Sequence, residues 1–115
     1  MKESILKTKS YKFAIRIVKL YQFLSGEKKE FVLSKQILRS GTAIGALIRE
    51  AEFAQSKADF TNKMNVALKE ANETSYWLEI LKDTDYLNEK IFQSLHSDCE
   101  ELIRMLVSSV KTSKK

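Results

Sequence analysis

Few side chains in this 115-residue sequence could do nucleophilic, acid–base or metal chemistry. His96 and Cys99 are the single histidine and the single cysteine, and their three-residue spacing would bring two metal ligands to one face of a helix. A structural zinc site takes four such ligands, and the chain has no other Cys or His. Cys99 also falls on an apolar stripe, where a small buried thiol is favoured over a metal ligand. The sequence therefore predicts no metal and no cofactor.

Two carboxylates, Glu70 and Glu73, lie one helical turn apart and could act as an acid–base or metal pair. A structural role is favoured, because the helix register places both carboxylates opposite a cation, Arg39. If a helical hairpin turns at Ser56, Arg39 lies seventeen residues before the turn and Glu73 seventeen after it. We therefore expect Arg39 to form an ion pair between helices with Glu70, Glu73 or both, and a plain solvated face is the alternative.

Spacing excludes two known sites of helical and nucleotide-binding proteins. A di-iron carboxylate centre needs Glu-x-x-His on each of two helices, but Gln93 stands three residues before the only histidine. Gly41-x-x-x-Gly45 lies inside a predicted helix, with neither a Lys-Ser/Thr pair after it nor a strand before it, so it is not a phosphate-binding loop. We expect no enzymatic activity.

The elements that position these residues are helices. Proline is absent and glycine occurs three times, which is too little turn chemistry for a β-rich fold of this length. Apolar residues recur at three- and four-residue spacing in four segments. The expected helices are 10–24, ended by a glycine cap at Gly26; 31–53; one that follows Ser56 and reaches Leu81; and one capped by Asp85 or Asn88 that reaches Val110.

Four helices joined by short loops predict an all-α, up-down-up-down antiparallel four-helix bundle. Residues 1–115 would form this single domain, and we expect residues 1–9 and 111–115 to be basic, partly disordered ends. The single cysteine, the charged first residues and the lack of a long apolar run favour a cytoplasmic protein with no membrane segment.

Small residues predict where two helices approach closely. Gly41 and Gly45 each cost a helix about 1 kcal/mol relative to alanine, so their presence suggests contact with another backbone. In a hairpin centred on Ser56, Gly45 is level with Ala67 and Gly41 is level with Ala71. We expect these four residues to pack the second helix against the third.

The charge is unevenly distributed. The whole chain has a net charge of +5, and residues 1–29 hold eight basic and two acidic side chains. A bundle of this topology would bring the basic residues of the first helix and of the C-terminal end close together. The predicted surface for RNA or DNA is formed by Lys9, Lys12, Arg16, Lys19, Lys111, Lys114 and Lys115. Binding there would be directed at the backbone and sensitive to salt, while the alternative is a solvated surface that aids solubility.

Apolar residues exceed what one small core can cover. Phe23, Tyr76 and Trp77 lie beside the predicted core stripes rather than within them, and we assign them to an oligomer interface. The rival functional hypothesis follows from the same residues: an oligomeric scaffold or adaptor that binds a protein partner and has no nucleic-acid role.

The segments Gln36–Glu50 and Ala67–Leu78 resemble the "four helix bundle protein" family, first named for proteins encoded in intervening sequences of bacterial 23S ribosomal RNA genes. The second segment resembles the family's Leu-Lys-Glu-Ala-x-Glu-Thr-x-x-Trp-Leu run. The matching residues here are Leu68, Lys69, Glu70, Ala71, Glu73, Thr74, Trp77 and Leu78.

This resemblance covers nearly the whole chain and implies a four-helix bundle assembled as a homopentameric ring. It brings no enzyme activity with it. Relatives include the accessory subunit of diversity-generating retroelements, a basic protein that binds nucleic acid and partners a reverse transcriptase. The basic surface expected here is more moderate than that relative's.

Overall fold

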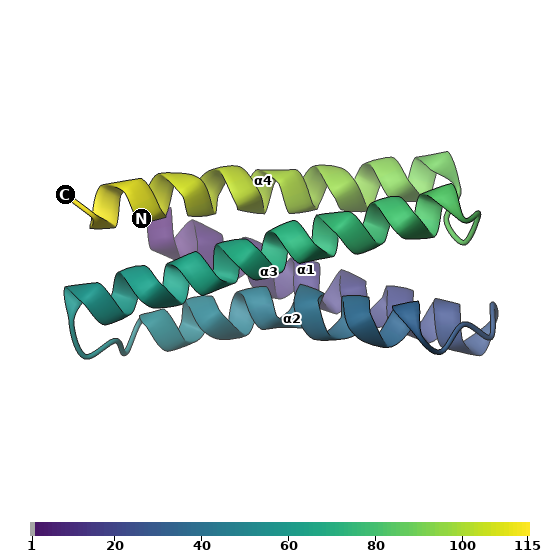
Figure 1. The fold of residues 1–115 in the computed structure, drawn as a ribbon, viewed down its shortest axis with the longest axis horizontal. Coiled ribbons are helices and arrows are strands. Elements are labelled where there is room, and N and C mark those ends of the chain that lie inside the picture. Colours follow the sequence, from purple (N-terminus) through teal and green to yellow (C-terminus); the bar gives the residue numbers. More distant parts are fainter. Residues whose placement is uncertain (1) are drawn as a thin grey trace.

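The computed structural model describes residues 2–115 and contains four helices in this range, with no strand among the described residues. Figure 1 shows an up-down-up-down antiparallel bundle, as predicted, that measures 44 × 21 × 19 Å. The helices are α1 (Lys2–Gly26), α2 (Leu33–Ala51), α3 (Lys57–Asp83) and α4 (Glu89–Ser113). We call the end that holds both termini and the α2–α3 loop the terminal end (residues 2–11, 46–63 and 103–115), and the opposite end the distal end.

Side-chain caps set the starts of α3 and α4. Ser56 has an extended backbone, and its hydroxyl accepts a hydrogen bond from the Asp59 backbone N–H at 3.0 Å. At the start of α4 the Asn88 side chain accepts from the Ile91 N–H at 2.8 Å, which decides between the two caps that the sequence leaves open. Asp85 instead occupies the preceding turn with a φ of 67°.

The cap of α2 comes from outside the helix. The Glu30 carboxylate accepts hydrogen bonds from the backbone N–H groups of Val32, Leu33 and Ser34 at 3.1, 2.9 and 2.7 Å. Burial opposes the ionised form of Glu30, but these hydrogen bonds outweigh it and lower the pKa of the carboxyl group below its usual value of 4.5. A negative charge at this point also suits the positive end of the helix dipole.

The first helix is longer than its predicted range. It begins at Lys2 instead of residue 10, because Leu6 is fully buried and extends the core stripe through Ser10 and Phe13 toward the N-terminus. Residues 2–9, expected to belong to a partly disordered end, lie in α1, while Met1 lies outside the described residues. At the other terminus α4 includes residues 111–113, which were also expected to be disordered.

Two other predicted helix ends differ. Gly26 is the last residue of α1 and does not adopt a positive φ, so it is not the left-handed cap that was expected. Lys29 takes the left-handed conformation in the loop, with a φ of 56°. Phe31 and Phe53 lie outside α2 rather than at its ends, and they are exposed by 53% and 81%.

The glycines of α2 face α1, which corrects the prediction that they pack against Ala67 and Ala71 of α3. A Cβ atom on Gly41 would lie 2.8 Å from two side-chain carbons of Ile17, and one on Gly45 would lie 3.4 Å from the backbone oxygen of Ser10. Successive residues of a helix point about 100° apart. Gly41 therefore faces α1, while a neighbouring face of α2 contacts α3. Ala67 and Ala71 are nonetheless fully buried in the core.

Candidate nucleic-acid interface

The two candidate metal or nucleophilic residues are structural. Cys99 is fully buried and its thiol lies 3.3 Å from the Ala71 carbonyl oxygen, and burial raises the pKa of that thiol to about 12. His96 Nε2 lies 3.0 Å from the Ser75 hydroxyl, and its ring stacks on Phe92. Within residues 2–115 no three His, Cys, Asp or Glu side chains converge as a metal site would require.

The carboxylate pair on α3 is held by Arg39, in the arrangement that the helix register predicts. The Arg39 guanidinium donates to Glu70 Oε1 at 3.1 Å and also to Glu73 Oε2. The indole N–H of Trp77 donates to the same Glu73 oxygen at 3.0 Å. The hydrogen bond from Trp77 and then that from Arg39 lower the pKa of Glu73. A carboxylate held ionised in this way is suited to joining α2 to α3 rather than to proton transfer.

Two of the predicted nucleic-acid contacts on α1 are engaged with α4. Lys9 Nζ lies 3.2 Å from Glu101 Oε1, and Arg16 Nη1 lies 2.7 Å from Asp98 Oδ2. Arg16 also donates to the Ser94 hydroxyl at 2.9 Å. These contacts tie α1 to α4 and offset much of the positive charge that the α1 sequence suggests.

The other two predicted contacts on α1, Lys12 and Lys19, are exposed and form no ion pair with the described side chains. They lie seven residues apart, and Arg16 between them is neutralised by Asp98. The predicted α1 surface therefore contains two cations that are paired with carboxylates of α4 and two that are not.

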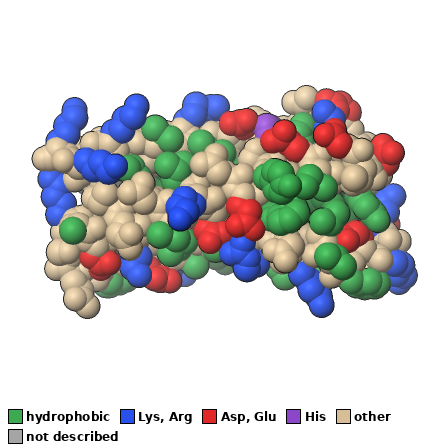
Figure 2. All heavy atoms as spheres, viewed as in Figure 1, with side chains coloured by type: hydrophobic (Ala, Val, Ile, Leu, Met, Phe, Trp, Pro, Cys, Tyr) green, Lys and Arg blue, Asp and Glu red, His purple; other side chains and the backbone are tan. Residues whose placement is uncertain are grey.

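The terminal end has a different charge balance. Residues 103–115 contain four basic and no acidic side chains. These four cations form no ion pair with any residue that the structure describes: Arg104, Lys111, Lys114 and Lys115. Figure 2 shows Lys and Arg side chains gathered over this half of α4, whereas acidic side chains lie mainly toward the middle and the distal end. Arg104 was not among the predicted contacts, although its spacing of seven residues before Lys111 places it on the same exposed stripe.

A polar groove of about 490 Å³ lies between the start of α3 and the end of α4, and we call it the terminal groove. A hydrogen bond of 2.8 Å from Thr61 to Ser113 joins its two walls. Ammonium and amide groups are suitable donors to phosphate oxygens, and no carboxylate lines the groove. Its lining residues are Lys57, Ala58, Thr61, Asn62, Asn65, Ser113 and Lys114.

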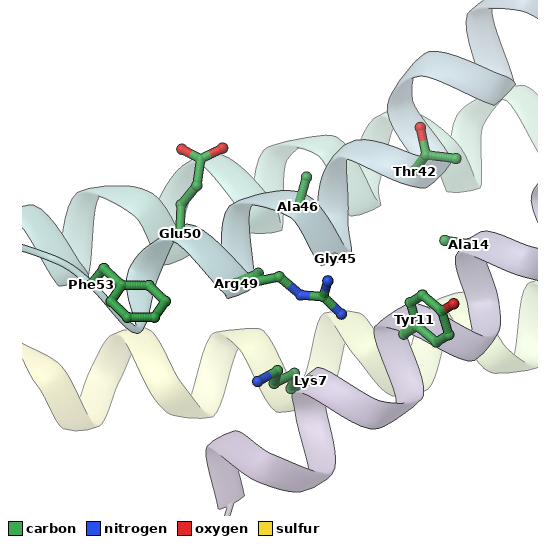
Figure 3. Close-up of a pocket in the computed structure, with 9 residues that line it drawn as sticks. All are labelled: Lys7, Tyr11, Ala14, Thr42, Gly45, Ala46, Arg49, Glu50 and Phe53. Atoms are coloured by element: carbon green, nitrogen blue, oxygen red, sulfur yellow. The ribbon is translucent and has the colours of Figure 1, made fainter.

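A second groove at the terminal end, of about 390 Å³, lies between α1 and α2, and we call it the aromatic groove (Figure 3). Three of its lining residues have small side chains or none: Ala14, Gly45 and Ala46. The remaining lining residues are Lys7, Tyr11, Thr42, Arg49, Glu50 and Phe53. The groove was not predicted, because the sequence pattern places Phe53 within the second helix and does not show which residues of α1 and α2 meet.

The residues predicted to form an oligomer interface differ in exposure. Tyr76 is 57% exposed and meets Trp77 edge to face at 5.1 Å, while Trp77 and Phe23 are half-buried against the core. Figure 2 shows a hydrophobic patch on the distal half of the face that carries α3. The patch provides an apolar surface that a partner could cover.

None of the helices in the described part of the chain has both the length and the hydropathy to cross a membrane.

The chain is similar to one family model and to a solved structure. A family model described as 23S rRNA-intervening sequence protein matches residues 2–108. A 1.70 Å crystal structure from Bacteroides thetaiotaomicron VPI-5482, described as a protein with unknown function from the S23 ribosomal protein family, is 59% identical with a TM-score of 0.95. The similarity covers 96% of this chain and 99% of that one. No curated protein matches the sequence.

Proposed function

Since the chain belongs to the 23S rRNA-intervening sequence protein family, we propose that it is a non-enzymatic, oligomeric bundle that binds the backbone of RNA or DNA through its terminal end. One observation carries the proposal: the cations of residues 103–115 have no carboxylate partners among the described residues, and Lys57 and Lys114 line a groove without a carboxylate. By contrast, Arg16 and Arg39 are each neutralised by a carboxylate of a neighbouring helix.

Unpaired lysines and arginines favour phosphate groups because each contact releases condensed counterions from the nucleic acid. Backbone contacts carry no direct sequence information, so the proposal predicts little sequence preference. In an oligomer the terminal end is repeated, and one strand that spans several copies gains avidity from contacts that are individually weak.

Fluorescence anisotropy with labelled mixed-sequence RNA and DNA, single-stranded and duplex, tests the proposal across a range of salt concentrations. We expect the logarithm of the association constant to fall linearly with the logarithm of salt concentration, with a slope of about −2 or steeper. Absence of binding at low salt would overturn the proposal and leave the charge as a solvated surface.

A second candidate function is favoured by the exposure of Tyr76 beside Trp77. In that case the bundle is an oligomeric scaffold or adaptor for a protein partner, such as a reverse transcriptase. Light scattering of the purified protein measures the subunit number, for which the family resemblance implies five. A Tyr76→Ser variant that keeps the wild-type subunit number would exclude Tyr76 from the interface between copies and leave its surface for a different protein.

A further inference from the structure

Building on the proposed function, we infer that the aromatic groove between α1 and α2 holds an unpaired nucleobase, so that the preferred ligand is single-stranded nucleic acid. The inference rests on three features of the groove: two exposed aromatic rings, one cation with no carboxylate partner among the described residues, and small residues in its lining.

The aromatic rings are Tyr11 and Phe53, which are 56% and 81% exposed. Figure 3 shows Phe53 toward one end of the groove and Tyr11 toward the other, with the side chains of Arg49 and Lys7 between them. A phenyl ring that is four-fifths exposed gives up most of the free energy that burial would provide. Base stacking on such a ring recovers part of that free energy and is tolerant of sequence, because every base has a π face.

Charge complementarity favours a nucleotide over an uncharged aromatic ligand. The Arg49 guanidinium carbon lies 5.6 Å from the centre of the Tyr11 ring, and Arg49 forms no ion pair with the side chains that the structure describes. Glu50, which lines the groove, and Glu52, the partner of the lining residue Lys7, are already engaged. Lys7 Nζ lies 2.8 Å from Glu52 Oε1, and Lys63 Nζ lies 3.3 Å from Glu50 Oε1. Arg49 is therefore the uncompensated charge and can bind the phosphate attached to a stacked base.

The size and position of the groove agree with this ligand. A volume of about 390 Å³ falls within the range of about 300–1,000 Å³ seen for small-molecule sites. Because Ala14 and Ala46 have only methyl groups, a flat ring can approach the helix backbones closely beside them. Bases inside a duplex are already stacked on each other, so only an unpaired base can enter.

Phe53→Ser is the variant that tests the inference, because its ring is mostly exposed and the fold does not depend on it. Phe31→Ser is the matched control, since Phe31 is 53% exposed in the loop at the distal end. The probes are labelled oligothymidylate of 20 nucleotides and a mixed-sequence 20-base-pair duplex, with anisotropy measured at one low salt concentration.

We expect Phe53→Ser to weaken oligothymidylate binding by roughly five- to a hundredfold, as for the loss of one stacked base, and to change duplex binding less than twofold. Phe31→Ser should change neither. Equal losses on both probes, or no loss on either, would overturn the inference while the proposed function stands. If the wild-type protein binds neither probe, both are wrong.

The alternative occupant of the aromatic groove is a second copy of this chain. The wild-type protein and Phe53→Ser also distinguish this alternative from a nucleobase. Light scattering of Phe53→Ser should give the wild-type subunit number. A smaller assembly would show that the aromatic groove is a contact between copies, which overturns the assignment of a base to it.

Discussion

The middle of the bundle and its terminal end use the same residue types in opposite ways. In the middle, Arg16 lies against Asp98, and Arg39 is held between Glu70 and Glu73. At the terminal end the cations of residues 103–115 have no such partners among the described residues. The middle thus uses its arginines to join helices, while the last part of α4 and the residues after it leave their cations free for a ligand.

This difference shows why counting charges along one helix misleads. Lys9, Lys12, Arg16 and Lys19 form an apparently continuous basic stripe, but α4 supplies carboxylates to two of them. Those ion pairs are partly exposed, so each contributes only about 0.2–1 kcal/mol to stability. Their larger effect is to remove positive charge that a phosphate group would otherwise meet.

The largest expected effect comes from reversing charge in the terminal groove. Lys57→Glu combined with Lys114→Glu should weaken binding of mixed-sequence RNA or DNA at low salt by about thirtyfold or more and reduce the salt slope by about 2, because two phosphate contacts are lost. The matched control is Lys12→Glu with Lys19→Glu, which changes the same charge on unpaired cations of α1. A control that loses as much affinity as the groove variant would contradict the contrast between the two regions.

Packing between α1 and α2 should tolerate an added methyl group less well at Gly41 than at Gly45, which lines the aromatic groove. Gly41→Ala places a methyl group 2.8 Å from Ile17 and should lower the free energy of unfolding by about 1–2 kcal/mol. Gly45→Ala, which meets Ser10 at 3.4 Å beside the aromatic groove, should be neutral or stabilise by up to about 1 kcal/mol through helix propensity. Urea unfolding of both variants measures this, and equal effects would contradict the packing difference.

Acid should weaken the hydrogen bonds at Glu30 that begin α2. Because folding lowers the pKa of Glu30, its contribution to stability is present above the usual carboxyl pKa of 4.5 and is lost as the pH falls through the lower folded value. Glu30→Gln should therefore cost about 0.5–1 kcal/mol at pH 7 and progressively less as the pH falls below 4.5. Urea unfolding measures the difference in free energy of unfolding between wild type and variant. A difference that stays constant with pH would contradict this role.

The smallest effect is expected where the cations are already paired. Lys9→Gln with Arg16→Gln should change nucleic-acid affinity less than twofold, because Glu101 and Asp98 compete with phosphate for these two side chains. Its cost in stability should be about 1 kcal/mol or less. A large loss of affinity would return the binding surface to α1.

The sequence was sufficient to predict the features that depend on the periodicity of each helix and on the register between adjacent helices. Periodicity gave four helices and their topology, and counting from Ser56 placed Arg39 opposite Glu73. Both succeed because adjacent helices of a hairpin keep a register that a short turn determines. The buried state of Cys99 also followed from its place on an apolar stripe.

The features that were not predicted correctly depend on contacts between helices that are distant in the sequence. The partner of Gly41 is Ile17 of α1 rather than a residue of α3, since the angle at which α2 faces its two neighbours is set by packing. The pairing of Lys9 with Glu101 joins residues 92 positions apart, which no hairpin count can supply. The aromatic groove likewise needs the relative placement of Tyr11 and Phe53.

Lysine footprinting tests the central contrast most directly, because it compares both surfaces in one sample and in any state of assembly. The protein is acetylated briefly with and without saturating single-stranded nucleic acid, and the modified lysines are quantified by mass spectrometry. We predict protection of Lys57, Lys111, Lys114 and Lys115 at the terminal end, with Lys12 and Lys19 unchanged. Protection of Lys12 and Lys19 with the terminal end unchanged would contradict the account.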